Sequence, residues 1–447
     1  MNIHNLVSSS NERTNTIKRN VFYSVLIRGV NIMISFILVP LTINYVSSEL
    51  YGIWLSLSSI VSWFSFFDIG FGLGLRNRLT NALAFKQYKY GKILVSSTYA
   101  FMTVIFLVTG LLACIGCIFV DWAYLLNISP EYNDAVTASF QIVIIAFCIR
   151  MILQIVTNVC QAYQMTALAN AIDMVGNVLS LLFMIALVYT VAPSLVYLSA
   201  ALCLAPFIAF LLANIILFKG RFRAVSPSVH YVRSFVLGDI TSLGAKFFLI
   251  QIICVILYQA TNFIISHFCG PEQVTVYNIA YKYLNIAVMA FSIIQSPIWS
   301  AFNDASAKKD YSWMIYIYKK LLRIIILSEL LIVVLVVFSP IVYNLWIGDS
   351  VEIPFHITVL LAVYTGILLV NNMHAMIING MGVIKLQTIT ALLQGIVFVP
   401  AVYFLAISYN LEGILIALIL VTILPCYFLI KQVYVQLNQK AKGIYNK

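Results

Sequence analysis

The chain is unusually apolar for its length. Of its 447 residues, 62% are hydrophobic and 9% are charged, whereas a soluble domain is about half apolar and about a quarter charged. Surface-to-volume scaling would leave too much of this apolar surface in water, which excludes a soluble enzyme and a disordered chain. The apolar runs are continuous, unlike the short alternating segments of an outer-membrane barrel. The expected fold class is therefore an all-α polytopic membrane protein.

Twelve apolar runs are long enough to cross a bilayer. We expect the first to be retained rather than cleaved as a signal peptide, because Met1–Asn20 is polar. In chain order, the expected spans are Val21–Tyr45, Leu50–Leu75, Ile93–Val120, Ala135–Cys160, Met165–Val191, Leu195–Phe218, Ser234–His267, Val274–Ala301, Leu321–Leu345, Pro354–Asn379, Leu386–Ile407 and Leu411–Ile430.

The basic residues set the expected orientation of these spans. With the N-terminus in the cytoplasm, 22 of the 26 Lys and Arg residues fall in cytoplasmic segments, and the outside loops hold none. Acidic residues populate the outside loops instead: Glu49, Asp121, Glu131, Asp134, Glu272, Asp349, Glu352 and Glu412. We therefore expect both termini in the cytoplasm, and we interpret most of the net charge of +11 as a cytoplasmic rim rather than a nucleic-acid surface.

The loops and cysteines argue against catalysis. The longest outside loop, between Asp121 and Asp134, leaves no room for a soluble catalytic domain, and the sequence has no phosphate-binding Gly-Lys-Ser/Thr loop. Cys114 and Cys117 form a C-x-x-C pattern inside an apolar run, where we expect them to pack as small hydrophobes. We expect no enzyme activity, cofactor, metal site or disulfide framework.

The four remaining basic residues fall within expected spans: Arg28, Arg150, Lys246 and Lys282. Charges near the bilayer centre cost about 2.5–3.5 kcal/mol each and usually face a bundle interior or a hydrated cavity. Acidic residues within spans include Asp173, Asp239 and Glu329. One interpretation of these charges is structural ion pairing between helices. The other is a binding site for a charged cargo.

Polar stripes at helical spacing favour the binding site. Arg28 shares a helix face with Asn31, Arg150 with Gln154 and Asn158, Lys246 with Asp239, and Lys282 with Asn278 and Asn285. A single ion pair does not require an amide stripe through the bilayer, whereas a hydrated cavity does. Central cations within such stripes predict an anionic cargo.

A weak internal repeat divides the chain into an N-terminal six-helix lobe, 1–226, and a C-terminal six-helix lobe, 227–447. Similar short turns follow the fourth and tenth spans, Gln161–Gln164 and Asn379–Gly382. An even number of spans per half makes the repeat parallel, as in transporters that bind substrate between two halves and rock them alternately.

The span pattern, the turn Asn379-Gly380-Met381-Gly382 and the early block from Leu50-Tyr51-Gly52-Ile53-Trp54 through Asp68-Ile69-Gly70 to Leu75-Arg76-Asn77 resemble the polysaccharide-unit flippases. These are O-antigen and capsule repeat-unit exporters of the multidrug/oligosaccharidyl-lipid/polysaccharide (MOP) superfamily. The resemblance implies a MATE-like fold of two lobes around a central cavity. It also implies an undecaprenyl-diphosphate-linked oligosaccharide as substrate, moved from the cytoplasmic to the periplasmic leaflet of the bacterial inner membrane. Arg28 and Lys282 match functionally important basic positions of relatives that flip the peptidoglycan precursor.

We therefore expect Arg28 and Lys282, with Arg150 and Lys246, to bind the diphosphate. Asn31, Gln154, Asn158, Asn278 and Asn285 are expected to bond sugar hydroxyls or to line the cavity, and Asp239, Asp173 and Glu329 are unranked candidates for a coupling proton or sodium ion. Expected partners are membrane lipids and other polysaccharide-assembly proteins, but not nucleic acid. Three alternatives remain: a multidrug extruder of the same superfamily, a membrane glycan polymerase and a scaffold that transports nothing.

Overall fold

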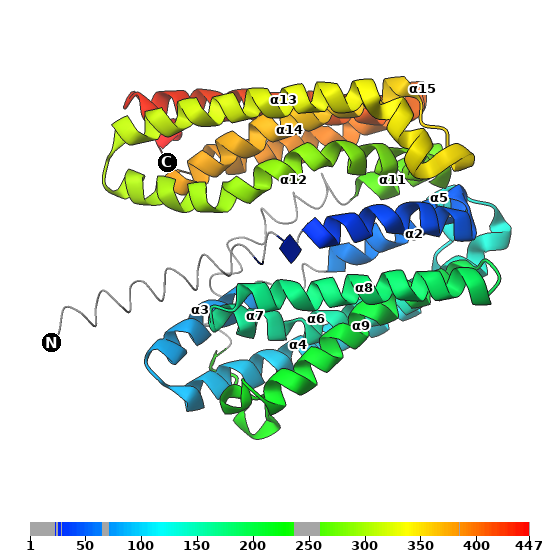
Figure 1. Cartoon of the computed structure of the whole chain (residues 1–447), viewed down its shortest axis with the longest axis horizontal. Coiled ribbons are helices and arrows are strands. Elements are labelled where there is room, and N and C mark those ends of the chain that lie inside the picture. Colours follow the sequence, from blue (N-terminus) through cyan, green and yellow to red (C-terminus); the bar gives the residue numbers. More distant parts are fainter. Residues whose placement is uncertain are drawn as a thin grey trace. The chain divides into compact units, whose positions relative to one another are not determined.

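The computed structural model describes residues 23–446 except 24, 25, 28, 65–70, 237–259 and 384. Within those residues the chain contains α and 3-10 helices, and no strand (Figure 1). Two compact units arise from the contacts, Met1–Gln251 and Ile252–Lys447. The expected lobe boundary at residues 226 and 227 stays a prediction.

The N-terminal unit is built from long helices joined by short turns. Ser47 caps the start of α2, where its hydroxyl accepts a hydrogen bond from the Leu50 amide at 3.3 Å, and Asp121 caps α5 in the same way at Tyr124. The helices are Gly29–Val46, α2 (Ser48–Trp63), α3 (Phe71–Ala84), α4 (Tyr88–Gly116), α5 (Trp122–Leu126), α6 (Asn133–Leu153), α7 (Ile155–Ala162), α8 (Thr166–Thr190) and α9 (Leu195–Lys219).

Helix α9 packs against both α8 and α6 in this unit. A Cβ on Gly176 of α8 would lie 3.2 Å from the Cα of Pro206 on α9, so glycine lets the two backbones approach closely. Phe106 and Phe210 are fully buried beside them. Small residues at helix contacts are the usual device where lipid removes the hydrophobic advantage of large ones.

The fourth expected span, Ala135–Cys160, is not one continuous helix. A tight turn at Gln154 separates α6 from α7, because the Thr157 amide bonds to the Gln154 carbonyl at 2.9 Å rather than to that of Leu153. The freed backbone carbonyl of Leu153 accepts a hydrogen bond from the side-chain Nδ2 of Asn214 on α9 at 2.8 Å. The Tyr99 hydroxyl of α4 in turn donates a hydrogen bond to the side-chain Oδ1 of Asn214 at 2.6 Å. Asn214 therefore stabilises the broken helix.

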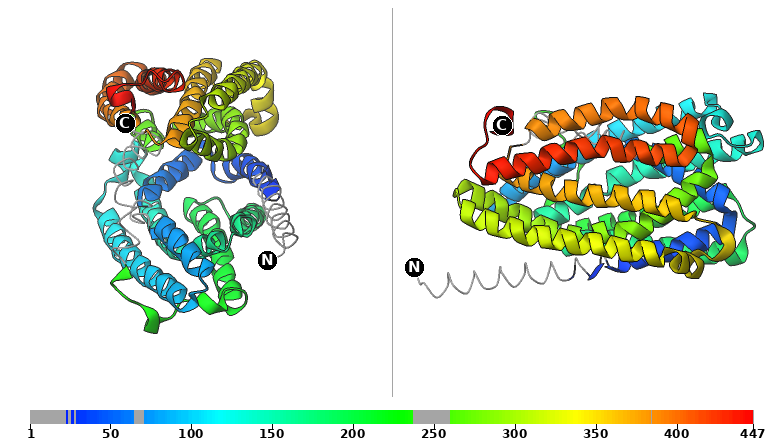
Figure 2. Two further views of the ribbon diagram at one scale, coloured as in Figure 1. Left: turned by 90° about the vertical axis from the view of Figure 1, so that its left-hand side faces the viewer. Right: turned by 90° about the horizontal axis from the view of Figure 1, so that it is seen from above.

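The C-terminal unit contains α11 (Thr261–Cys269), α12 (Pro271–Ala307), α13 (Tyr311–Ile347), α14 (Phe355–Met381) and α15 (Lys385–Leu437). Asn410 has positive φ and divides α15 into two arms. The arms lie side by side (Figure 2), and the Gln394 amide on one donates to the Thr422 hydroxyl on the other at 3.4 Å. The division falls between the two last expected spans. A buried cluster including Phe302, Met373 and Val433 joins α12, α14 and α15.

Eight helices in the described ranges are long and apolar enough to span a membrane, α15 counting once. Their outward faces carry large apolar side chains: Ile326, Val333 and Val337 on α13 are each more than half exposed. Such faces suit lipid rather than water. The chain is therefore a multi-pass membrane protein. The count of twelve spans stays a prediction, because parts of the second and seventh lie outside the described residues.

Replacing Asn214 with Leu should destabilise the N-terminal unit, because the Leu153 carbonyl at the helix break then lacks a partner. We expect a loss of about 1–3 kcal/mol, measured by thermal unfolding of the purified protein in detergent. Tyr99→Phe removes one neighbouring bond and should cost less, about 0.6 kcal/mol. Asn344→Leu, at an exposed position on α13, is the matched control. Equal melting temperatures for the Asn214 and Asn344 variants would contradict this role.

Candidate functional site

The structure distributes the expected site residues over both units. Arg28, Lys246 and Asp239 lie outside the described residues, so their positions stay predictions. The N-terminal unit places Asn31, Arg150, Gln154, Asn158 and Asp173; the C-terminal unit places Asn278, Lys282, Asn285 and Glu329.

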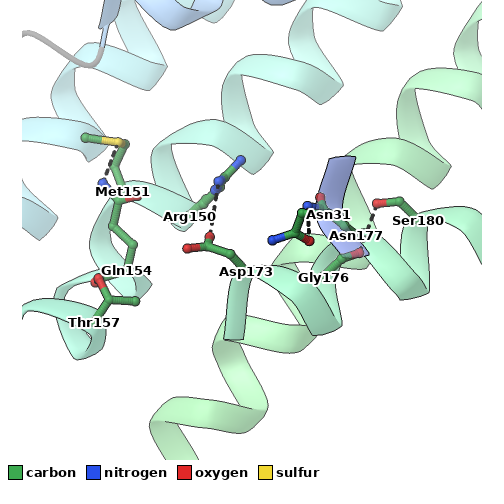
Figure 3. Close-up of polar contacts among 9 residues, drawn as sticks. All are labelled: Asn31, Arg150, Met151, Gln154, Thr157, Asp173, Gly176, Asn177 and Ser180. Carbon is green, nitrogen blue, oxygen red and sulfur yellow. Dashed lines mark hydrogen bonds and ion pairs between the residues drawn. The ribbon is translucent and has the colours of Figure 1, made fainter. Parts of the chain in front are cut away.

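Arg150 and Asp173 form an ion pair between α6 and α8. The guanidinium Nη2 lies 3.7 Å from Asp173 Oδ1 (Figure 3), and both side chains are 45% exposed. The guanidinium also lies over the Phe210 ring, 5.5 Å from its centre. Arg150 belongs to the last turn of α6, where the helix dipole favours a cation. The break at Gln154 thus ends α6 so that Arg150 lies at its carboxyl end.

A second polar contact lies farther along α8. The Asn177 amide donates to the Asn31 carbonyl oxygen at 3.0 Å, joining α8 to the helix Gly29–Val46 (Figure 3). Asp173, Asn177 and Ser180 recur at helical spacing and share one face of α8. The sequence analysis missed Asn177, although its spacing from Asp173 carried the signal. Asp173 and Asn31, predicted for different roles, both contribute to the polar contacts of α8.

The other two expected N-terminal residues, Gln154 and Asn158, make their contacts away from this face of α8. The Gln154 amide contacts the Met151 sulfur at 3.0 Å within its own turn. Asn158 lies against α3: a Cβ on Gly72 would be 2.7 Å from its Nδ2. The glycine therefore makes room for this amide at the contact between α3 and α7. Both side chains are partly buried.

In the C-terminal unit, a polar face follows α12. The Asn278 amide donates to the Asn262 carbonyl oxygen of α11 at 2.8 Å and to the Val274 carbonyl at 2.8 Å. Lys282 and Asn285 follow at four and seven residues from Asn278, on the same face of α12, and both are partly buried. Asn262 is a further residue that the sequence analysis missed. The hydrogen bond to Asn262 of α11 therefore holds the Asn278 side chain, which lies on the same face of α12 as Lys282.

Glu329 lies elsewhere, on α13 opposite Gly366 of α14. Its Oε2 is 2.5 Å from where a Cβ on residue 366 would stand, so the carboxyl group lies directly against the bare glycine. Its Oε1 is buried without a hydrogen-bond partner in the described part of the chain. The carboxyl group differs in this respect from Asp173, which is paired.

Comparison with known protein families places this geometry in context. A model of the family described as polysaccharide biosynthesis protein matches residues 17–302. The chain belongs to this family. It is 22% identical over 406 residues to a Yersinia pseudotuberculosis protein named for O-antigen export, covering 88% of this chain and 90% of the relative. It is also 23% identical over 427 residues to a Salmonella typhi protein named for O-antigen transport, covering 91% and 94%.

Solved structures show the fold of this polysaccharide biosynthesis family member. An inward-facing MATE transporter of the MOP superfamily superimposes with a TM-score of 0.72 at 14% identity, over 92% of this chain and 100% of the other. A MOP superfamily transporter from Pyrococcus furiosus gives 0.66 at 13% identity, over 96% of each chain. The expected MATE-like, all-α fold is therefore confirmed.

A double-mutant cycle tests the Arg150–Asp173 pair. Arg150→Met and Asp173→Leu should each destabilise the protein by leaving one charge unpaired, and the double variant should be less destabilised than the sum by about 1 kcal/mol. Thermal unfolding in detergent measures the difference. Arg150→Met combined with Asp349→Leu, a change at an exposed residue of the other unit, should be additive. Additivity of the Arg150 and Asp173 changes would show that the two groups do not interact.

Proposed function

We propose that this protein is a flippase that moves an undecaprenyl-diphosphate-linked oligosaccharide repeat unit from the cytoplasmic to the periplasmic leaflet by alternating access. It would act in the bacterial inner membrane, with both termini in the cytoplasm, for O-antigen or capsular polysaccharide synthesis. The observation that carries the proposal is family membership together with two relatives, named for O-antigen export and transport, that align over about nine-tenths of their length. The MATE fold supplies the transporter architecture.

The cargo chemistry agrees with the intramembrane cations. A diphosphate carries negative charge, and Arg or Lys provides the opposite charge and hydrogen-bond donors. Arg28 and Lys282 would bind it, with Arg150 and Lys246 contributing. The Pyrococcus furiosus structure is described as having a binding pocket of reversed polarity and, for that reason, a different function. In this chain, a basic binding site would favour an anionic cargo over the organic cations of a drug extruder.

The amides would serve the sugar part of the substrate. Asn31, Gln154, Asn158, Asn278 and Asn285 offer both donors and acceptors, which sugar hydroxyls require. Asn31 and Asn278 already make amide–amide bonds, to Asn177 and Asn262. A sugar hydroxyl could insert into such a bond by accepting from one side-chain amide and donating to the other, which leaves neither amide unpaired. These exchangeable contacts suit a ligand that must bind and then leave.

Asp173 would couple the cargo to an ion. Its ion pair with Arg150 is half exposed, so a diphosphate approaching Arg150 would compete with the carboxylate. A proton or sodium ion on the released Asp173 would offset its charge. Asp239 and Glu329 stay alternatives for the same role. The protein would do this work without being an enzyme, alongside the other proteins that assemble the polysaccharide.

Charge reversal tests the proposed diphosphate site. Arg28→Glu and Lys282→Glu should each lower the surface polysaccharide of a complemented deletion strain by more than about tenfold, because a carboxylate would repel the diphosphate. Lys282→Arg keeps the charge and should retain most export. Lys385→Glu, at an exposed residue where α15 begins, is the matched reversal and should have little effect. Immunoblotting would confirm equal protein levels.

Normal export by both reversed variants would contradict the diphosphate role. Accumulation of lipid-linked units on the cytoplasmic side in the deletion strain supports a flippase. Export of single, unpolymerised units in that strain would instead indicate a polymerase. Efflux of a fluorescent cationic dye, without any polysaccharide defect, would indicate a multidrug extruder.

A further inference from the structure

Glu329 is a carboxyl group beside an exposed apolar surface of the C-terminal unit. It lies on α13 between two apolar depressions with volumes of about 530 and 470 Å³, both of which are lined by Glu329, Ala362 and Val363. The first continues over Gly366 and Val370 of α14 to Tyr427 of α15. The second continues along α13. The neighbouring Leu330, Val333 and Val363 are all about half exposed, so the depressions open at an apolar surface of this unit.

The described surroundings give Glu329 no charged partner. The titratable groups that line the two depressions beside it are the Cys426 thiol and the Tyr427 hydroxyl, both on α15. Helix α14 contributes none there. Helix α12 also packs against α13, and its Tyr283 hydroxyl donates a hydrogen bond to the Leu335 carbonyl of α13 at 2.9 Å. Within the described residues, no ion pair or hydrogen bond reaches the carboxyl group.

An unpaired carboxylate in this setting is unfavourable, and a bound proton removes its charge. A sodium ion is a poorer occupant, because hard cations take several oxygen ligands, and the only other side-chain oxygen lining the two depressions is the Tyr427 hydroxyl. The described residues also hold no cluster of three or more His, Cys, Asp or Glu that could bind a metal ion. The chemistry therefore favours a proton.

We propose that Glu329 is a proton-binding site in which the neutral acid packs against Gly366 and holds α13 close to α14. Loss of the proton would leave an uncompensated charge at this helix contact, and the carboxylate would have to move toward water or recruit it. Protonation at Glu329 would thus control the packing of α13 on α14. Its use to drive export rests on the proposed function; the proton site itself does not.

Chemical labelling tests the site directly. Dicyclohexylcarbodiimide is apolar and adds to protonated carboxyl groups: the acid oxygen attacks the central carbon, and the proton passes to nitrogen. The full-length protein in proteoliposomes should be labelled at Glu329 at neutral pH at least about tenfold more than at the exposed Glu272 and Glu352. Labelling should fall as the pH is raised, and Glu329→Gln should abolish it. Absence of labelling at Glu329, or labelling equal to that of the exposed acids, overturns the proposal.

The pH dependence of stability provides a second test. If the folded protein holds the proton more tightly than the unfolded chain, its stability is lost as the pH rises and the proton leaves. The melting temperature of the wild type should therefore fall more between mildly acidic and alkaline pH than that of Glu329→Gln. Glu352→Gln should behave as the wild type. Identical pH dependence in the wild type and Glu329→Gln would refute the proton site.

The contact between the Glu329 carboxyl group and Gly366 can be tested by a matched pair of glycine substitutions. Gly366→Ala should lower the melting temperature, because its methyl group needs the space of the carboxyl oxygen, and this loss should largely disappear in a Glu329→Ala background. Gly116→Ala meets no atom within 4 Å and should have the same small effect in both backgrounds. An unchanged effect of Gly366→Ala after removal of Glu329 would disprove the contact.

Export separates this proposal from the proposed function. If Glu329 is labelled and the protein exports repeat units, Glu329→Gln at normal expression should reduce surface polysaccharide several-fold, whereas Glu352→Gln should not. Full export by Glu329→Gln would disprove the use of this proton in transport. If the deletion strain shows no export defect, the flippase assignment fails, yet labelling at Glu329 and the pH-dependent melting would be unaffected.

Discussion

Inside the hydrocarbon region, every polar group must find its partner within the protein or in a hydrated space. This constraint explains the break between α6 and α7. The turn at Gln154 frees the Leu153 carbonyl, and Asn214 satisfies it from α9 while Tyr99 holds Asn214 in place. A broken helix is tolerated because these side chains replace the missing backbone bond. The same break puts Arg150 at a helix carboxyl end, beside Asp173.

Hydropathy predicted the long apolar helices that the structure describes, because a spanning helix needs a long apolar run whatever its neighbours are. The kink at Asn410, for example, falls between the two expected spans Leu386–Ile407 and Leu411–Ile430. Hydropathy could not reveal the break at Gln154. The residues around it are apolar, and the partner that stabilises it, Asn214, is distant in sequence.

The candidate site likewise combines features that follow from a single helix with features that depend on contacts between helices. Amide and charge spacing along single helices predicted Arg150, Asn31 and Lys282, because residues on one helix face are fixed by the helical repeat. The partners across helices, Asn177 and Asn262, depend on tertiary packing, which spacing alone does not specify. An ion pair also changes the role that can be assigned to a residue. Asp173, predicted as an ion site, neutralises Arg150, so the cation that would attract a diphosphate is not free until that pair opens.

The two acidic residues therefore lend themselves to different tasks. Asp173 has a counter-charge in Arg150, and an anionic ligand of Arg150 can take its place. Glu329 has an apolar groove and a glycine instead, so its neutral form is the stable one. Exchange of partners at Asp173 would respond to an anionic cargo, whereas Glu329 would respond to proton activity without contacting the cargo. A transporter with both would respond to its cargo at Asp173 and to proton activity at Glu329, and communication between the two residues would require a conformational change that alters both helix contacts.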